Sequence, residues 1–468
     1  MQSTDRLIEY GLNLFRRSRE PFAVKVLGEQ VYAITSPEDA VLVYKCTTAF
    51  SWDVYLNKLL VGFGLRDDAL KVAWHKPEPG EACYIHENPL NPQHKSMIHA
   101  IEDVYKQQLL PGDKLEEIIQ MAIARMEDTL RWEQFLGPFL AGHTKTHKRI
   151  SVAQFCRIKV TYITTGAMFG DAMFKLQPNL TELMMDLSDN AWALVFGYPK
   201  VLLPKKLKHA WKELCGTIRQ FWQAPERDRA DASWAINSII QLQEQFEMDD
   251  ESRDSLLAMI SWAANANTVD SAFWLLNYLL FDQDLLSAIR EETRPAFVNG
   301  SVDVWYLIKN CPLLEATWFE MLRVVNGALS VRKVTAPIVV GGKLLQPGNT
   351  VAIPFRQLHF NEHVWGDDRH EFNPHRFLKD QKLRSHPAYR PFGGGASFCP
   401  GRYLAMAEAC GFVAMFLHRF DVVLSDTGNG VRQRFPLQDD TKPSTGISGV
   451  LDNMDVLMDV RPLREEMV

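Results

Sequence analysis

The pattern of hydrophobic and polar positions changes twice along the chain. Residues 23–35 (AVKVLGEQVYAIT) alternate with the two-residue period of strands around a Gly-Glu turn. Between about residues 91 and 318, apolar positions recur at three- and four-residue intervals, which predicts a mostly helical middle. A strand pattern returns over residues 335–354, around Gly-Gly and Pro-Gly turns. We therefore predict a mainly α fold with a small β-sheet region, formed as one interlocked unit over residues 1–468.

Two long apolar segments are predicted to be buried helices. The first, residues 255–281, contains Asn265, Asn267, Asp270 and Asn277, which would be costly to place in lipid, so it fits a helix through a large protein core. The second runs from about residue 401 to 420 and follows a loop-rich stretch. The first residues of the chain (MQSTDRLIE) are polar, so no secretory signal is indicated.

Composition narrows the class of protein. The chain has 468 residues, of which 46% are hydrophobic and 23% charged, so it is globular rather than disordered. The 51 Lys and Arg residues against 57 Asp and Glu residues give a net charge of −6, which argues against broad nucleic-acid binding. The 7 cysteines include no CxxC pair, so a reducing compartment is the simpler expectation and a disulfide framework is not.

The cysteine with the most informative surroundings is Cys399, in the segment FGGGASFCPGR at residues 392–402. It directly precedes a predicted helix, where free N–H groups and the positive end of the helix dipole favour a thiolate. The glycines allow the backbone to pass close to a flat, bulky group. A hydrogen-bonded thiolate in an apolar setting is what an axial iron ligand requires. A buried structural cysteine beside a glycine-rich turn is the alternative.

The string Phe392-x-x-Gly395-x-x-x-Cys399-x-Gly401-Arg402 resembles the haem-binding signature of the cytochrome P450 superfamily. Upstream, EMLR at residues 320–323 resembles the ExxR helix of that superfamily, and FNPHRF at residues 372–377 is similar to its FxPERF segment, with His375 in place of the usual glutamate. The resemblance implies the haem-thiolate P450 fold and haem b (iron protoporphyrin IX). The implied haem-site residues are the axial ligand Cys399 together with Phe392, Gly395 and Gly401.

The resemblance also assigns charged residues around the haem. Glu320, Arg323 and Arg376 match a buried ion network, which we expect to be structural because buried charges are tolerated only when they are fully paired. Microsomal members usually place a basic residue two positions before the cysteine to bind a haem propionate, whereas this chain has Ser397 there. We expect Arg332 to supply that contact, with Lys95 and His99 as weaker candidates.

Residues 261–274 (SWAANANTVDSAFW) resemble the oxygen-activating helix of the monooxygenases. Thr268 takes the position of the catalytic alcohol, and Asn267 replaces the acid that usually precedes it. An asparagine can hold water but cannot shuttle a proton by titrating. In isolation, such a pair would be read as a polar kink in a core helix. The wider string and residues 192–204 (WALVFGYPKVLLP) resemble the branch of sterol 7α-hydroxylase, sterol 12α-hydroxylase and prostacyclin synthase.

That branch leaves different functions open. Its hydroxylases use O2 and electrons from NADPH–cytochrome P450 reductase, and Thr268 favours such a reaction on a hydrophobic polycyclic substrate, for example a steroid or terpenoid. Prostacyclin synthase instead isomerises an endoperoxide without external electrons. A haem protein that binds an apolar ligand without turnover is the alternative outside enzymes.

Members of the branch normally carry an N-terminal membrane helix, which this chain lacks. We expect an enzyme of the endoplasmic reticulum membrane, on the cytosolic face, with the anchor missing, or otherwise a cytoplasmic protein. Residues 192–204 are apolar and aromatic, with lysines in or after them, and suit a loop that dips into a lipid interface. A buried loop beside a solvated lysine helix is the alternative. The lysines are Lys200, Lys205, Lys206 and Lys208.

The segment from His359 to His363 (HFNEH) matches the H-x-x-E-H string of zinc hydrolases. That chemistry needs both histidines on one face of a helix. Because the string lies in a loop-rich region, we expect a structural role.

Overall fold

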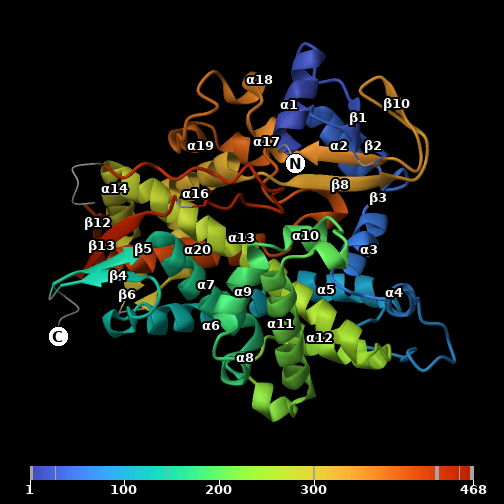
Figure 1. Cartoon of the computed structure of the whole chain (residues 1–468), viewed down its shortest axis with the longest axis horizontal. Coiled ribbons are helices and arrows are strands. Elements are labelled where there is room, and N and C mark those ends of the chain that lie inside the picture. The colour runs from blue at the N-terminus through green and yellow to red at the C-terminus, as the bar shows by residue number, and fades with distance from the viewer. Residues whose placement is uncertain are drawn as a thin grey trace.

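The structure is a computed structural model. It describes residues 4–463, except 27, 145, 299–300, 427–431 and 453. Helices form most of the molecule, and the largest sheet lies at one end, beside the N-terminal helix α1 (Thr4–Leu14) (Figure 1). The predicted mainly α fold with small sheets is confirmed.

The largest sheet joins strands from distant parts of the chain. Its order is β1 (Phe22–Val26), β2 (Glu29–Ala33), β11 (Thr350–Pro354), β8 (Leu329–Val334) and β3 (Phe50–Ser51). Strands β2 and β11 pair in parallel, and the other neighbours pair antiparallel. The hairpin of β9 (Ile338–Val340) and β10 (Lys343–Leu345) connects β8 to β11. The two predicted strand regions are therefore partners in one sheet.

A second sheet has the order β12 (Phe420–Leu424), β13 (Leu457–Pro462), β5 (Lys148–Ser151) and β4 (Leu140–His143). The strand pair β4–β5 and the short hairpin of β6 (Phe297–Val298) and β7 (Ser301–Val302) interrupt the region predicted to be mostly helical. Strand β5 is polar, and it is held in place by pairing with β13 near the C-terminus. Local periodicity does not reveal such a partner.

Most of the remaining chain is helical. Helix α2 begins at Pro37, after a cap in which the Ser36 Oγ accepts a hydrogen bond of 3.3 Å from the backbone N–H of Asp39. The helices before the central one are α2 (Pro37–Lys45), α3 (Asp53–Gly62), α4 (Asp67–Trp74), α5 (Met97–Leu109), α6 (Asp113–Thr129), α7 (Val152–Phe169), α8 (Ala172–Leu176), α9 (Leu180–Ser188), α10 (Trp192–Val195), α11 (Lys205–Gln223) and α12 (Trp234–Gln245). Those after it are α14 (Gln283–Thr293), α15 (Val304–Asn310), α16 (Pro312–Val325), α17 (Phe355–His359), α18 (Glu362–Trp365), α19 (His375–Lys379) and α20 (Arg402–Arg419).

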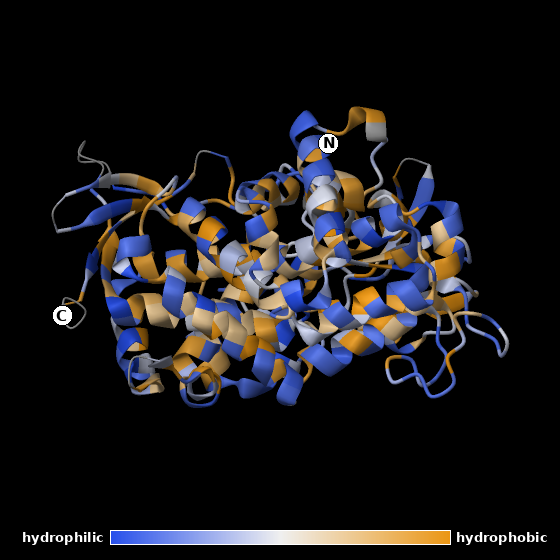
Figure 2. Cartoon of the chain, turned by 90° about the horizontal axis from the view of Figure 1, so that it is seen from below, coloured by the Kyte–Doolittle hydropathy of each residue, from blue (hydrophilic) through white to orange (hydrophobic). Residues whose placement is uncertain are grey.

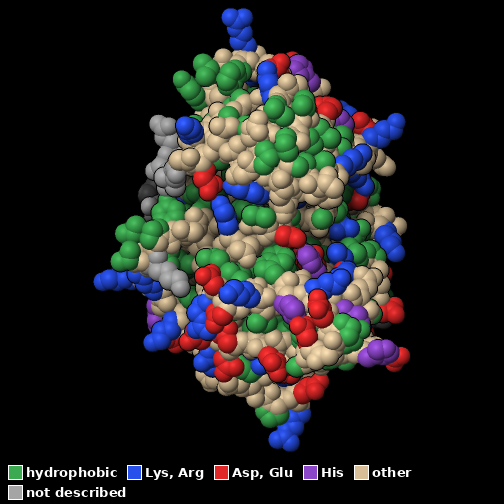
Figure 3. All heavy atoms as spheres, turned by 90° about the vertical axis from the view of Figure 1, so that its right-hand side faces the viewer, with side chains coloured by type: hydrophobic (Ala, Val, Ile, Leu, Met, Phe, Trp, Pro, Cys, Tyr) green, Lys and Arg blue, Asp and Glu red, His purple; other side chains and the backbone are tan. Residues whose placement is uncertain are grey.

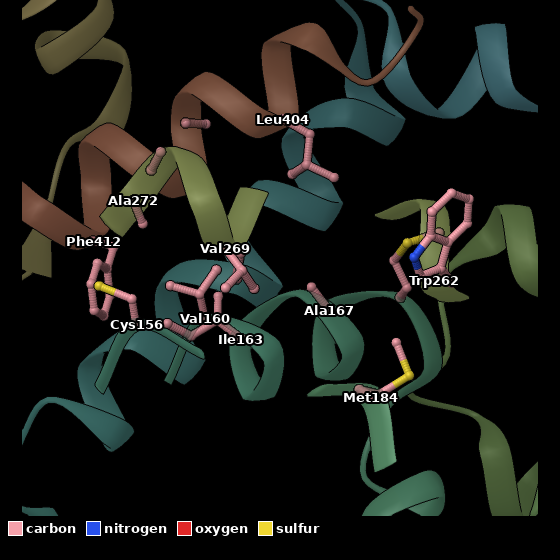
Figure 4. Close-up of a cluster of buried hydrophobic side chains, with 14 of the residues drawn as sticks. Cys156, Val160, Ile163, Ala167, Met184, Trp262, Val269, Ala272, Leu404 and Phe412 are labelled. Carbon is pink, nitrogen blue, oxygen red and sulfur yellow. The ribbon is translucent and has the colours of Figure 1, made fainter. Parts of the chain in front are cut away.

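The central helix is α13 (Asp250–Phe281), which is 32 residues long and packs against α7, α11 and α20. Cys156 and Val160 of α7, Val269 of α13 and Phe412 of α20 belong to one buried apolar cluster (Figure 4). The prediction of a buried helix over residues 255–281 is confirmed. The NH2 group of its buried Asn265 is partnered, because the Nδ2 donates 2.9 Å hydrogen bonds to the Thr165 Oγ1 and to the Ser261 carbonyl oxygen.

Apolar residues occupy the inward sides of many helices, and polar residues dominate the loops at the rim (Figure 2). Within the described part of the chain, no helix combines the length and the apolar character needed to cross a bilayer.

Candidate active site

The glycine-rich loop before α20 folds back on itself. Gly393 and Gly395 have φ angles of +82° and +64°, a region that side-chain-bearing residues seldom adopt. The backbone N–H of Cys399 donates a 3.1 Å hydrogen bond to the Phe392 carbonyl oxygen, which closes the loop. A Cβ at Gly394 would come within 2.9 Å of the Tyr44 ring, so the loop also requires a glycine to pack against α2. These contacts place the cysteine at the start of α20, as predicted.

The surroundings of the Cys399 sulfur fit a thiolate ligand. Burial raises the pKa of the thiol, whereas the backbone N–H groups of Gly401 and Arg402 and the positive charge of Arg402 lower it. A Cβ at Gly401 would lie 3.9 Å from the Sγ. Hydrogen-bond donors directed at a sulfur in a largely apolar setting are what an axial haem ligand requires.

Arg332, on β8, reaches the same loop from the large sheet. Its side chain is buried, and its Nη2 donates to the Ser397 Oγ and, at 3.3 Å, to the Gly394 carbonyl oxygen. The guanidinium carbon lies 5.4 Å from the centre of the Tyr44 ring and 5.0 Å from that of Trp52. The arginine therefore supplies positive charge at Ser397, the position where microsomal relatives carry a basic residue.

The other two propionate candidates have partners of their own. The Lys95 Nζ forms an ion pair with Asp103 on α5. The His99 Nε2 lies 3.2 Å from an Asp53 carboxylate oxygen on α3. Of the three candidates, the structure brings Arg332 into contact with the cysteine loop.

The predicted charge network is assembled around α16. Glu320 and Arg323 have no solvent-exposed side-chain surface. Both carboxylate oxygens of Glu320 accept 2.8 Å hydrogen bonds from Arg323, and the Arg376 Nε donates to the same carboxylate at 3.0 Å. The remaining N–H groups of Arg323 donate to the carbonyl oxygens of His359, Arg369 and Glu371. The network thus ties α16 to the loop-rich stretch that precedes the cysteine.

The two histidines of the H-x-x-E-H string have different surroundings. The His359 Nδ1 donates to the Arg323 carbonyl oxygen at 3.0 Å, and its Nε2 accepts from the backbone N–H of Arg390 at 3.0 Å. Burial and the charge of Arg323 lower the pKa of His359 to about 3, so the ring is neutral. His363 is largely exposed. His359 thus connects α16 to Arg390, which lies just before the cysteine loop.

Comparison with known proteins agrees with this geometry, because the cytochrome P450 family profile matches residues 109–438. The chain belongs to the cytochrome P450 family. Membership of this family implies a haem-thiolate cofactor with a cysteine ligand.

Among its curated relatives are several P450 monooxygenases. Cytochrome P450 monooxygenase calL of Penicillium decumbens is 28% identical over 58% of this chain and 56% of its own length. Cytochrome P450 monooxygenase poxD of Penicillium oxalicum is 25% identical over 86% of this chain and 80% of its own length. A 7-alpha-hydroxycholest-4-en-3-one 12-alpha-hydroxylase of Oryctolagus cuniculus is 24% identical over 77% of this chain and 73% of its own length.

Two side chains of α13 hydrogen-bond to carbonyl oxygens one turn earlier in the helix. The Thr268 Oγ1 donates to the Ala264 carbonyl oxygen at 3.1 Å, and the Ser271 Oγ donates to the Asn267 carbonyl oxygen at 2.7 Å. Side-chain bonds of this kind compete with the backbone hydrogen bonds and often bend a helix. The helix is continuous from Asp250 to Phe281, so these bonds fix the orientation of the Thr268 hydroxyl within it.

Asn267 is fixed from outside the helix. Its Oδ1 accepts a 2.8 Å hydrogen bond from the backbone N–H of Ile447, in the C-terminal segment. Gly446 lies so close to the amide that a side chain there would collide with it. The orientation of the asparagine thus depends on a contact 180 residues away in the sequence.

Some residues around the site belong to no sequence motif, so the sequence did not identify them as site residues. Tyr44 and Trp52, which flank Arg332, lie far upstream of the haem signature. Asp270 is visible in the sequence only as a polar residue in an apolar helix, yet it shares a cavity with Asn267.

Proposed function

We propose that this P450 is a monooxygenase that hydroxylates or oxidises a hydrophobic polycyclic substrate, such as a steroid, a terpenoid or a related natural product. It would use O2 and electrons from NADPH–cytochrome P450 reductase, with residues 1–468 acting as a single catalytic unit. The observation that carries the proposal is the place of Thr268 in the middle of the buried helix α13, with its Oγ1 held 3.1 Å from the Ala264 carbonyl oxygen. A hydroxyl there can pass on a proton, which monooxygenation requires and an electron-independent isomerisation does not.

In this proposal the haem, when bound, supplies oxygen activation, and the chain controls its surroundings. Cys399 provides the thiolate, which the N–H groups of Gly401 and Arg402 stabilise. Arg332 pairs with a propionate. Thr268 hands protons to the oxygen side, and Asn267 holds water beside it. Glu320, Arg323 and Arg376 keep the cysteine loop in register with α16.

The aromatic side chains near the exposed turn of α13 support a flat apolar substrate. Trp262 of α13 has its ring centre 5.1 Å from that of Phe63, which in turn lies 5.5 Å from Trp211. Ala263, the next residue along α13, is exposed although the helix around it is buried. Aromatic side chains are common in sites for lipophilic ligands. The relative that acts on 7-alpha-hydroxycholest-4-en-3-one supports the steroid class.

We also propose contact with a membrane surface at the endoplasmic reticulum. In the segment of residues 192–204, Ala193 and Leu194 are buried, whereas the side chains of Phe196, Val201 and Leu202 are 41%, 80% and 68% exposed. The exposed apolar side chains support contact between the later part of this segment and lipid. Lys205, Lys206 and Lys208 follow it, all exposed. Hydrophobic side chains also gather over the upper part of the face shown in Figure 3. Val339 and Leu344 of the β9–β10 hairpin are likewise exposed.

A reductase partner is supported by one relative, a bifunctional cytochrome P450/NADPH–P450 reductase of Gibberella moniliformis, which is 30% identical over 37% of this chain. In that protein the two catalytic units share one polypeptide. Here we propose that the reductase is a separate protein.

The experiment is a haem absorption titration with steroids, terpenoids, fatty acids and an endoperoxide mimic, controlled by a reduced carbon monoxide spectrum. A red-shifted thiolate band and a low-to-high-spin change with a polycyclic compound are expected. NADPH consumption with reductase then separates the functions. A monooxygenase consumes NADPH and forms product, and an isomerase forms product without NADPH. If a compound binds but no product forms with or without NADPH, the protein is a haem protein that binds an apolar ligand without turnover.

A further inference from the structure

A cavity of about 120 Å³ lies beside the central helix α13. It has room for several water molecules, each of which occupies ~30 Å³ in the liquid. Asn267 and Asp270 line it from α13, and residues of α7, α9 and the C-terminal segment close it. Its outer end reaches the surface, because Asp189 and Lys442 in its wall are exposed.

Asn267 and Asp270 supply the polar groups of the cavity on the side of α13. Asp270 follows Asn267 by three positions, which puts both side chains on the same face of the helix. The Asn267 Oδ1 is already held by the Ile447 N–H, so its Nδ2 donors are left to hold water. The next residue, Thr268, donates its hydroxyl hydrogen bond to the Ala264 carbonyl oxygen. The cavity thus holds a carboxyl and an amide, and the threonine hydroxyl belongs to the residue that directly follows the amide.

We propose that Asp270 is the proton-relay residue of this P450, carrying protons from solvent through the cavity to water held by Asn267 and on to the Thr268 hydroxyl. It would take over the role that the acid before the threonine has in other monooxygenases, from one turn further along the helix. The inference rests on monooxygenation as proposed above but not on the identity of the substrate.

The proton balance is simple. The O–H bond of the protonated Asp270 carboxyl breaks and its proton forms a new O–H bond with a cavity water, which releases another proton towards Asn267. The carboxylate that remains is stabilised by the Arg157 guanidinium and is reprotonated from solvent through the outer end. One proton has then moved inward, and the electrons for O2 reduction come from NADPH through the reductase.

The charges around the cavity suit this cycle. Burial raises the pKa of Asp270 to about 7, the positive charge of Arg157 opposes that rise, and the negative charge of Asp189 adds to it. A relay is most effective when its pKa lies near the working pH. The charged and titratable groups in the cavity wall are Arg157 of α7, Asp189 after α9, and Asp439, Lys442 and Asp452 of the C-terminal segment.

The test compares Asp270→Asn with Asp270→Glu, which keeps a carboxyl. The matched control is Asp189→Asn, which removes the other aspartate acting on Arg157, 2.7 Å from its Nη2. The readout is NADPH oxidation by the holoprotein with NADPH–cytochrome P450 reductase in the absence of substrate, so no substrate needs to be known. The rate is measured in H2O and D2O over roughly pH 5.5 to 8.5, on either side of the expected titration.

The wild-type rate is expected to fall as the pH rises through about 7, because the acid form of Asp270 is consumed. Asp270→Asn should lose that inflection, slow at least about tenfold and show a larger solvent isotope effect, since general acid catalysis contributes about 10²–10⁴-fold and cavity water still conducts some protons. Asp270→Glu should retain the inflection. Asp189→Asn should retain it at a slightly lower pH.

A wild-type profile without an inflection would overturn the proposal, and so would an Asp270→Asn variant with wild-type pH and isotope profiles. Infrared titration of the resting holoprotein gives a readout independent of turnover. The carbonyl stretch of a protonated carboxyl should disappear as the pH rises through about 7 and be missing in Asp270→Asn. A missing thiolate band in the reduced carbon monoxide spectrum would instead count against the haem ligand assignment alone.

Discussion

Replacement of Glu320 by glutamine would show how much the buried charge network contributes to stability. The carboxylate accepts two hydrogen bonds of 2.8 Å from Arg323, one of 3.0 Å from Arg376 and one of 2.9 Å from the backbone N–H of Asn373. Glutamine has nearly the same shape, but its NH2 group would face donors. Arg323 would lose its counter-charge, whereas Arg376 would keep that of Asp368 at 3.1 Å. Removing one partner of a buried pair costs about 3–5 kcal/mol.

That cost is a large part of the free energy of unfolding of a typical domain, which is about 5–15 kcal/mol. The assay is urea unfolding of the holoprotein, followed by far-UV circular dichroism and haem absorbance. Glu315→Gln, on the same helix, is the matched control. Its carboxylate pairs with Arg384 at 2.7 Å in a partly exposed position, so we expect a loss of about 1 kcal/mol or less. If Glu320→Gln unfolds within about 1 kcal/mol of the wild type, the stabilising role of the network is refuted.

Three further predictions concern the thiolate, the propionate and pH. Cys399→Ser should abolish the red-shifted band of the reduced carbon monoxide complex, whereas Cys46→Ser should keep it; a normal band in Cys399→Ser would exclude this ligand. Arg332→Ala should speed haem transfer to apomyoglobin at least about tenfold, equivalent to ~1.4 kcal/mol, and Lys95→Ala less than twofold; equal effects would reject the assignment to Arg332. The pKa of His359 is about 3 in the folded protein, against the ordinary histidine value of 6.5. The neutral ring therefore makes its full contribution to stability above pH 6.5, and this contribution is progressively lost as the pH falls below 6.5. At pH 5 the loss is about 2 kcal/mol, and His359→Asn should remove that part of the acid sensitivity in urea titrations, whereas an unchanged pH dependence would contradict it.

The sequence by itself determined the parts of this protein that depend on local pattern. Apolar spacing predicted the long buried helix that became α13 and the strands at both ends of the helical middle. The run of glycines before Cys399 predicted a loop at a helix start, because backbone conformation and helix-end polarity are properties of neighbouring residues. The pairing of Glu320 with Arg323 follows from three-residue spacing on one helix.

Only the tertiary structure decided which distant residues meet. Arg332 contacts Ser397 across 65 positions, and Asn267 contacts Ile447 across 180. Lys95, equally basic, pairs with Asp103 instead. The strands β4 and β5 could not be read from periodicity, because β5 depends on pairing with β13. The role proposed for Asp270 arises in the same way. Its charge is in the sequence, but the cavity and the neighbours that set its proton affinity exist only once three separate segments have packed around α13.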